Sequence, residues 1–335
     1  MRILFLIAGK NQPSSRWRVL NLLPHFERMG VTAEVEEIPR HSFIKQLLLA
    51  RRAKNADIVF WQKRLVSPIV VKYLRHCAQR FIYDFDDLVP FSRYNNAMNR
   101  KKERRFRAIV SNADAVIGYN NFLSNFACQY GARKSIVIPN AIDLSHWHPK
   151  SYNSVTPVRK VTLGWTGTDA HLGSISSLHN VWKRLAERFS NMEMKVLCNG
   201  SFALEGVPLN CKTFSVEDEP QDVAGFDIGI MPSKADLWYQ AKTPLKVLIY
   251  FACGLPVVAS PVGSSIRELV IDGVNGFLAG SEDEWVDKLS MLIEDVGLRR
   301  RLGGNARKMI EEKFSLEKVL GLYKELFESV MNGGN

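Results

Sequence analysis

The sequence predicts an α/β protein of two domains, each a doubly wound sheet of parallel strands with helices on both faces. Short apolar segments alternate with amphipathic segments along most of the chain, which is the pattern of repeated strand–helix–strand units. The alternation stops in "NAIDLSHWHPKSYNSVTPVRK", where two prolines and many polar residues predict a linker, and it restarts afterwards. Because 335 residues with 46% hydrophobic content can fill two cores, we expect domains at about 1–150 and 151–315.

The first domain is expected to open on a strand, because "RILFLIA" is a short apolar run without turn residues. "SSRWRVLNLLPHFERMG" repeats its apolar residues at helical spacing and predicts one helix that ends at Gly30. The same two criteria predict the remaining elements in order: strand 32–38, helix 42–56, strand 57–62, helix 67–79, strand 80–85, a basic helix 95–112, strand 115–119, helix 120–131 and strand 135–139.

The second domain repeats this alternation from "VTLGWTG" onwards, a strand that ends in small residues. The elements expected after it are helix 174–189, strand 192–200, a short strand 211–215, a loop with a helical turn at 216–226, strand 227–232, helix 243–254, strand 255–260 and helices that start at Ser264, Glu282, Leu298 and Leu316. Ligands of such sheets bind beyond the carboxyl ends of the strands, so the loops there are where we expect chemistry.

The formal net charge of +11 predicts an anionic partner: nucleic acid, an acidic membrane surface or a phosphorylated small molecule. Clustering of the cations at 51–54 and 100–107 favours peripheral contact with an anionic membrane, with a solvated helix face as the plain alternative. The sequence has no helix-turn-helix, zinc or aromatic-basic motif, so we do not expect a nucleic-acid partner.

Five cysteines without metal-ligand spacing predict reduced, packed thiols in a cytoplasmic protein, peripheral at most on the inner face of the membrane. The first residues are interpreted as a strand because no small-residue cleavage site follows them. No run of about 18 apolar residues predicts a membrane span.

Two loops of the second domain suit a phosphate group. Gly167 and Thr168 follow one strand, and a Gly-Ser-Ser turn at 263–265 follows another, so both place backbone N–H groups at a helix start. Lys242 and Lys246 are four residues apart, a spacing that places two ammonium groups on one face of a helix. Together these features predict a diphosphate site, although tight turns and a surface lysine pair would explain each feature separately. No nicotinamide or NTPase glycine motif is present.

The motifs "GWTGT", "FDIGIMPS" and "KTPLKVLIYFACGLPVVASPVGSSIRELVIDGVNGFLAG" closely resemble the retaining GT-B glycosyltransferases of family 4, the glycosyltransferase group 1 type. "SSRWRVLNLLPHF", "YDFDDLV" and "VIPNAID" resemble one branch of it more loosely. The resemblance implies two Rossmann-like domains facing a central cleft, an acceptor on the first and a nucleotide sugar on the second. It also implies a last helix that crosses back to the first domain, and transfer with retention, without cofactor or required metal.

Carried over residue by residue, the resemblance implies a donor site in four parts. Its parts are Gly167 and Thr168 at the diphosphate with Lys242 and Lys246, which are catalytic candidates that would stabilise its departure, Asn199 and Gly200 near the base, Gly263, Ser264 and Ser265 beside the sugar or its phosphates, and Glu268 as a ribose or supporting group. The implied function moves a hexose from a UDP- or GDP-sugar to a hydroxyl of a glycan or lipid-linked acceptor, in the synthesis of cell-surface polysaccharide or glycoconjugate.

One departure from the family leaves a second function open. The family commonly carries two glutamates eight positions apart, and this sequence has Ala241 and Ile249 there. Neither side chain can bind a hydroxyl or steady a developing charge. Phosphate electrostatics could still support catalysis, and the alternative is an inactive nucleotide-sugar-binding or scaffold protein of the same fold.

The first domain offers polar residues after two strands. Asp84, Asp86 and Asp87 follow the strand at 80–85 and are predicted to orient the acceptor or to act as general base, with Asp84 and Asp86 as the catalytic candidates. A metal-binding D-x-D, or ion pairs with Arg93 or the basic helix, are the alternatives. Ser15 and Arg16 follow the first strand, where a guanidinium suits an anionic or polyol acceptor.

Overall fold

The computed structural model describes residues 1–92, 97–151, 160–235, 237–242 and 244–333. The chain divides into two compact units. The first comprises Met1–Ala141, the segment with Ala241 and Lys242, and the C-terminal stretch from Glu317, and the second holds the remainder. Among the described residues, no helix has the length and apolar content to cross a bilayer.

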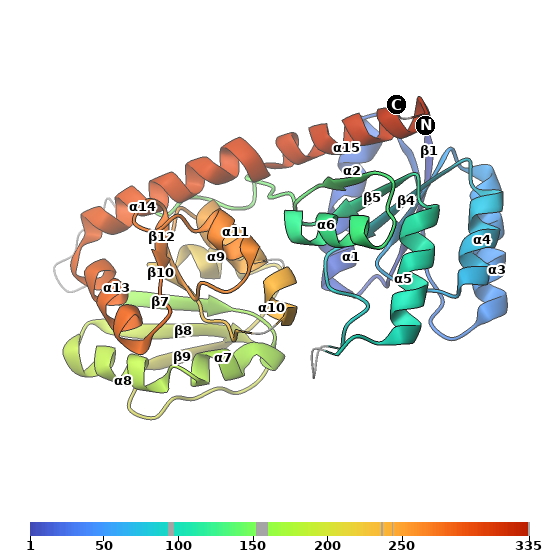
Figure 1. Cartoon of the computed structure of the whole chain (residues 1–335). Helices are drawn as coiled ribbons and strands as arrows, with labels where there is room; N and C mark the ends of the chain where they lie inside the picture. Colours follow the sequence, from blue (N-terminus) through green and yellow to red (C-terminus); the bar gives the residue numbers. More distant parts are fainter. Residues whose placement is uncertain (93–96, 152–159, 236, 243, 334–335) are drawn as a thin grey trace. The chain divides into compact units, whose positions relative to one another are not determined.

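The first unit is built on a six-stranded parallel sheet in the order β2-β1-β3-β4-β5-β6. Its strands are β1 (Arg2–Ile7), β2 (Thr32–Glu37), β3 (Ile58–Gln62), β4 (Arg80–Phe85), β5 (Ala115–Gly118) and β6 (Ser135–Val137). The helices are α1 (Pro13–Arg18), α2 (Leu23–Arg28), α3 (Phe43–Arg51), α4 (Pro68–Cys77), α5 (Arg100–Asn112) and α6 (Asn121–Gln129), with short 3₁₀ turns η1 (Leu20–Leu22) and η2 (Arg52–Asn55) (Figure 1). The parallel order confirms the predicted doubly wound arrangement.

The predicted helix at 14–30 is wrong as a single element, because the chain forms α1, η1 and α2 in succession. Val19 leaves helical geometry with φ −134°, and Pro24 enters the first turn of α2. A proline has no N–H to donate and tolerates only a first helical turn. Arg18, the last residue of α1 before the break, is buried, which matters for the site below.

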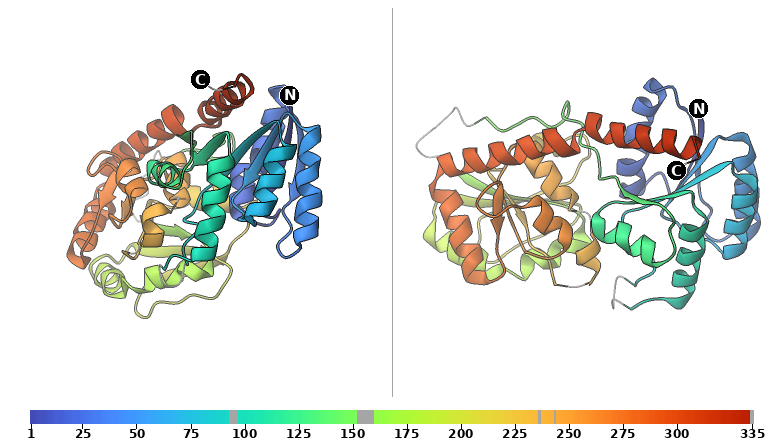
Figure 2. Two further views of the ribbon diagram at one scale, coloured as in Figure 1. Left: turned by 45° about the vertical axis from the view of Figure 1, so that its right-hand side comes forward. Right: turned by 45° about the horizontal axis from the view of Figure 1, so that its top comes forward.

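The C-terminal helix α15 (Leu316–Met331) packs on the first unit through its aromatic side chains. Tyr323 and Phe327 contact Phe26 of α2, with ring centroids 5.3 and 5.6 Å apart. Both views of Figure 2 show the end of the red helix beside the blue N-terminal elements. The end of the chain thus supplies part of the core of the first unit.

The second unit also has a six-stranded parallel sheet, in the order β12-β11-β10-β7-β8-β9. Its strands are β7 (Val161–Thr166), β8 (Met192–Cys198), β9 (Leu209–Thr213), β10 (Ile228–Met231), β11 (Val257–Ala259) and β12 (Gly276–Leu278). Its helical elements are η3 (Asp169–His171), α7 (Leu172–Ser176), α8 (His179–Arg188), α9 (Glu219–Ala224), α10 (Leu237–Ala241), α11 (Leu245–Ala252), α12 (Ser264–Leu269), α13 (Glu282–Glu294), α14 (Val296–Met309) and a π-helical turn η4 (Ile310–Phe314). Trp182 and Trp285 meet edge to face at 5.8 Å in its core.

Candidate functional site

The end of β7 brings a lysine of α11 against a glycine. The Lys246 Nζ atom lies 3.8 Å from the centroid of the Trp165 ring, close enough for a cation–π contact. A Cβ atom at Gly167 would lie 2.4 Å from the same Nζ atom, so glycine leaves the room that the ammonium group occupies. The structure therefore places two of the predicted donor-site residues, Gly167 and Lys246, side by side at the carboxyl end of an interior strand.

Lys242 does not share a helix with Lys246, and the prediction from their spacing was wrong. Helix α11 begins at Leu245 with Pro244 as its N-cap, and Lys242 lies outside α10 and α11. Proline is found at helix starts because it lacks the N–H that a helix interior needs. Lys242 groups with the first unit and Lys246 with the second.

The loop after β8 is tied to the loop after β7 by a carboxylate that the sequence did not single out. Asp169 Oδ1 accepts hydrogen bonds from the backbone N–H groups of Asn199 and Gly200, both at 3.0 Å. Thr168, just before Asp169, is exposed. His171 Nδ1 lies 3.1 Å from the Tyr239 hydroxyl. Asp169 thus fixes the two predicted base-side residues at the same end of the sheet as Gly167.

The turn after β11 needs its glycine. Gly263 has φ +88°, and a Cβ atom there would lie 2.8 Å from the Tyr239 carbonyl oxygen. Ser264 and Ser265 open α12; the Ser264 Oγ atom is buried and has no hydrogen-bond partner among the described residues, and Ser265 is buried. Glu268 is exposed on the same helix. The turn therefore places these three predicted donor-site residues at the carboxyl end of β11.

A buried polar network that the sequence did not predict supports the end of β7. The Thr166 hydroxyl donates to Glu219 Oε1 at 3.3 Å, and the Thr166 N–H donates to the Tyr250 hydroxyl at 3.1 Å. Burial raises the pKa of Tyr250 well above its ordinary value, so the phenol stays protonated. Ala241 and Ile249, which occupy the positions of the family's glutamates, are both buried.

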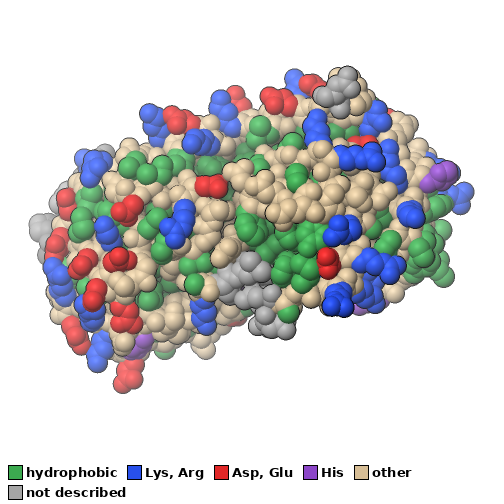
Figure 3. Space-filling view, in the orientation of Figure 1, with side chains coloured by type: hydrophobic (Ala, Val, Ile, Leu, Met, Phe, Trp, Pro, Cys, Tyr) green, Lys and Arg blue, Asp and Glu red, His purple; other side chains and the backbone are tan. Residues whose placement is uncertain are grey.

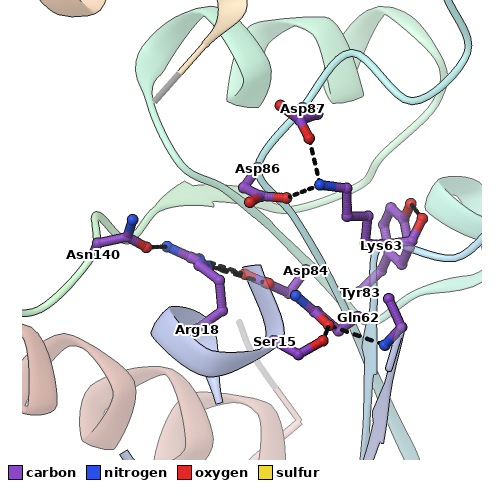
Figure 4. Close-up of polar contacts among 10 residues, drawn as sticks. Ser15, Arg18, Gln62, Lys63, Tyr83, Asp84, Asp86, Asp87 and Asn140 are labelled. Carbon is purple, nitrogen blue, oxygen red and sulfur yellow. Dashed lines mark hydrogen bonds and ion pairs between the residues drawn. The ribbon is translucent and has the colours of Figure 1, made fainter. Parts of the chain in front are cut away.

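In the first unit, Asp84 forms a buried ion pair with Arg18 (Figure 4). Arg18 Nε lies 3.1 and 3.2 Å from the two carboxylate oxygens, and Arg18 Nη1 donates to the Ile138 carbonyl at 2.6 Å. Burial alone would lower the pKa of Arg18, but Asp84 raises it above its ordinary value. Burial raises the pKa of Asp84, and Arg18 opposes that shift. Asp84 is fully buried, so the structure gives it a structural part in place of the predicted catalytic one.

Asp86 and Asp87 share one cation, Lys63, which the sequence analysis missed. Lys63 Nζ lies 2.9 Å from Asp86 Oδ1 and also pairs with Asp87 (Figure 4). Lys63 has φ +60°, rare for a side chain of its size, and Tyr83 donates to its carbonyl at 2.9 Å. Burial lowers the pKa of Lys63, but the two carboxylates raise it by more, so the net shift is upward and the ammonium stays charged. Asp86 and Asp87 remain partly exposed, whereas Arg93, the predicted partner, lies outside the described residues.

Hydrogen-bond donors without partners gather after β1 and β3. Gln62 Oε1 accepts from the Ser15 hydroxyl at 2.7 Å and from the Ala8 N–H at 3.1 Å, while Arg64 donates to the Ala8 carbonyl. Among the described residues, Gln62 Nε2, Arg16 Nε and Arg64 Nε are buried and lack a partner. Ser15 is fully buried against Gln62, which corrects its predicted contact with an acceptor. Arg16 stays a candidate: its guanidinium lies over the Trp17 ring, 5.6 Å from the ring centroid, and its Nε atom has no partner among the described residues.

Comparison with known proteins finds relatives of the second unit by sequence and of nearly the whole chain by fold. Residues 173–295 match the family model described as "Glycosyl transferases group 1". An uncharacterized glycosyltransferase from Methanocaldococcus jannaschii is 40% identical over 82 residues, which are 24% of this chain and 21% of that protein. The curated relatives are thus matched over only part of their length.

Several solved structures cover nearly the whole chain, and two of them serve as examples. HepE from Anabaena, solved with UDP and glucose, has a TM-score of 0.72 at 18% identity and covers 98% of this chain and 100% of its own. A glycosyltransferase from Rickettsia africae has a TM-score of 0.75 at 13% identity, with 98% of each chain covered. Identities this low show the fold only. The chain therefore has the GT-B fold, and residues 173–295 of its second unit match the group 1 glycosyl transferase model.

Proposed function

We propose that the protein transfers a hexose from a UDP- or GDP-sugar to a hydroxyl of a glycan or lipid-linked acceptor, with retention at the anomeric carbon, in the synthesis of cell-surface polysaccharide or glycoconjugate. The observation that carries this proposal is the Lys246 ammonium group seated against Gly167 at the end of β7. Lys246 lies within the residues that match the group 1 family. The HepE complexes with UDP and glucose support a uridine nucleotide as the first donor to test.

In this proposal, Lys246 stabilises the diphosphate as it leaves. A fixed positive charge in a site shielded from water lowers the energy of a departing anion without itself reorganising. The N–H groups at Gly263–Ser265 and the Ser264 hydroxyl add donors at the neighbouring strand end. Because these groups supply the charge compensation, we propose that transfer needs no metal or cofactor and expect turnover to persist in EDTA.

We propose an acceptor that carries an anionic or oxygen-rich group. Arg16, Gln62 and Arg64 each carry a buried N–H donor that has no partner among the described residues. Burial and the nearby Arg40 lower the pKa of Arg64, and Glu37 opposes that shift. A phosphate or carboxylate on the acceptor would satisfy these donors. Asp86 or Asp87, partly exposed beside Lys63, is then the better candidate to orient the reacting hydroxyl.

The direct test is nucleotide release from UDP- and GDP-sugars, measured with and without candidate acceptors. Release that rises when an acceptor is added, with a product of retained anomeric configuration by NMR, is the expected result. Saturable binding of a nucleotide sugar without turnover in any acceptor mixture would instead favour the scaffold function that Ala241 and Ile249 leave open.

Substituting Gly167 with alanine should weaken binding of the nucleotide. The new methyl group would lie 2.4 Å from Lys246 Nζ and 2.8 Å from the Trp165 ring, so the lysine must move away from its seat. We expect about a tenfold loss of UDP affinity by calorimetry, which corresponds to roughly 1.4 kcal/mol. Gly173→Ala is the matched control, because nothing lies within 4 Å of a Cβ there. Equal affinity in both variants would contradict the assigned position of Lys246.

We also propose peripheral contact with an anionic membrane through α3 and α4. Four large apolar side chains are exposed there: Phe43 (45%), Ile44 (70%), Leu48 (59%) and Ile69 (65%). Exposed cations lie among them on the same helices: Lys45, Arg51 and Lys72. Apolar side chains ringed by cations suit a surface of anionic lipid. Figure 3 shows basic side chains and green apolar patches together over the first unit, at the right.

Of the cation clusters predicted from the sequence, Arg51 lies on this surface, whereas Arg52 and the cluster at 100–107 contribute less to it. Arg52 pairs with Glu34 and Glu36. On α5, Arg107 stacks on the Tyr130 ring at 5.0 Å. None of the exposed large apolar side chains among the described residues lies on α5. The apolar anchor therefore favours α3 over α5 as the membrane contact.

Vesicle sedimentation tests this surface. Ile44→Ser/Leu48→Ser should lower binding to vesicles that contain phosphatidylglycerol several-fold, because each change removes an apolar side chain worth roughly 1.5–3 kcal/mol when buried. Ile271→Ser/Val274→Ser, both 45% exposed on the second unit, is the control and should bind like the wild type. Equal partitioning of the wild type into neutral and anionic vesicles would contradict the proposal.

A further inference from the structure

A basic pocket lies at the edge of the first sheet opposite the candidate acceptor residues. It has a volume of about 440 Å³. Arg80 is the first residue of β4, Asp114 precedes β5, and Arg133 and Lys134 precede β6. The pocket is therefore at the amino ends of these strands, whereas Asp86 and Gln62 lie at the carboxyl ends. It belongs wholly to the first unit and is separate from the site described above.

The charge that lines this pocket is mostly uncompensated. Its charged side chains are four cations and one carboxylate, a balance of 4 − 1 = +3: Arg75, Arg80, Arg133, Lys134 and Asp114. Asp114 is already engaged, because its Oδ2 atom lies 2.9 Å from Arg75 Nη1 and accepts the Phe81 N–H at 2.7 Å. Like charges held around one hollow repel each other, and an anion bound among them removes that repulsion.

Two of the cations are held in place by neutral groups of the last helix. Arg80 Nε donates to the Val330 carbonyl at 2.6 Å, and Lys134 Nζ donates to the Ser329 hydroxyl at 2.7 Å. These bonds fix the side chains without cancelling their charge. Among the described residues, no hydrogen bond or ion pair engages the two terminal amino groups of the Arg80 guanidinium, and Arg133 is exposed at the rim. A fixed guanidinium beside an ammonium is the combination that binds phosphate oxygens well.

We propose that this pocket binds a phosphate group with two or more negative charges, a phosphomonoester or a diphosphate. Its volume falls within the range of small-molecule sites. Because Val330 and Gly333 line it, a bound anion would also fasten the end of α15 to the sheet. The same chemistry is found in a soluble phosphate ester and in the headgroup of phosphatidic acid, and the experiment separates these two sources.

Calorimetric titration of the full chain with inorganic pyrophosphate tests the site. Arg133→Ala/Lys134→Ala should weaken binding at least about tenfold, since two of the charges that meet the ligand are lost. The control Lys101→Ala/Arg104→Ala removes two exposed cations of α5 and should bind like the wild type. Lys246→Ala, which would weaken pyrophosphate at the proposed donor site, should leave this binding in place. Arg133→Glu alone, at an exposed position, repeats the test if the double variant is poorly folded.

The source of the phosphate is decided with vesicles. Co-sedimentation with phosphatidylcholine vesicles that contain phosphatidic acid, lost in Arg133→Glu, would assign the pocket to a lipid headgroup. Pyrophosphate binding without that loss would assign it to a soluble ester. No saturable binding of either probe, or binding that Lys246→Ala abolishes and Arg133→Ala/Lys134→Ala leaves unchanged, would overturn the proposal. Equal weakening by the α5 control would also overturn the proposal, because pyrophosphate would then bind to surface charge in general and not to this pocket.

Discussion

Lys246→Ala is expected to lower kcat for sugar transfer by about 100- to 1,000-fold, the loss typical when one preorganised group that stabilises a developing anion is removed. The Lys246 Nζ atom lies against the Gly167 turn of the second unit. In the proposal, its positive charge compensates the negative charge of the departing diphosphate. The measurement is turnover of the nucleotide sugar that the wild type uses best.

Folding and charge are controlled separately in that experiment. Lys183→Ala, an exposed lysine of α8 in the same unit, should keep wild-type turnover. Lys246→Arg should recover only part of the rate, because a planar guanidinium does not fit the seat of an ammonium between Trp165 and Gly167. Wild-type turnover in Lys246→Ala with an unchanged melting temperature would remove Lys246 from the mechanism.

Arg18→Ala is expected to destabilise the first unit by about 3–5 kcal/mol, the usual cost of leaving one partner of a buried ion pair without its counter-ion. Arg18 and Asp84 are 1% and 0% exposed, so water cannot replace the lost guanidinium. The measurement is the denaturant midpoint of the unfolding transition of the first unit. The pair also holds the end of α1 to β4, so the loss should spread to the neighbouring loops.

Two variants separate the lost charge from the lost packing. Arg18→Met/Asp84→Leu removes both charges and should recover much of the stability, since replacing a buried pair by apolar side chains is often neutral. Arg52→Ala breaks an exposed pair with Glu34 and Glu36 and should cost less than about 1 kcal/mol. A loss of similar size in Arg18→Ala and Arg52→Ala would contradict the assigned burial cost.

Much of this fold follows from local pattern. Each predicted strand overlaps an observed one, because buried parallel strands are short apolar runs that their own sequence marks. The sequence predicts one helix at 14–30, whereas the structure has three short elements. The apolar residues keep a helical period across Val19, but the backbone leaves helical geometry there. Pro244 likewise separates Lys242 from the helix of Lys246. In both segments a proline, Pro24 or Pro244, lies at the start of the second helix and is the local signal of the break.

The contacts of the site were much less accessible from the sequence. Local motifs predict Gly167 and Lys246 separately as donor-site residues, and the fold brings the two together. No local motif predicts the role of Lys63. Its contact with Asp87 spans 24 residues, and its own backbone has a positive φ. Arg18 and Asp84 are 66 residues apart, and whether a carboxylate after a strand faces a ligand or an internal arginine is decided by tertiary packing. Residue types therefore predict where polar side chains gather. They do not predict which of those side chains already form ion pairs within the protein.

Binding of UDP to the full chain tests the central claim most directly. The account predicts one saturable site by calorimetry, a melting temperature that rises with UDP concentration, and affinity at least about tenfold weaker in Lys246→Ala, equal to about 1.4 kcal/mol or more. GDP is measured in parallel, because the proposed donor site accepts either base in principle. A chain that binds neither nucleotide, or binds both equally well with and without Lys246, would contradict a nucleotide-sugar site at the end of β7.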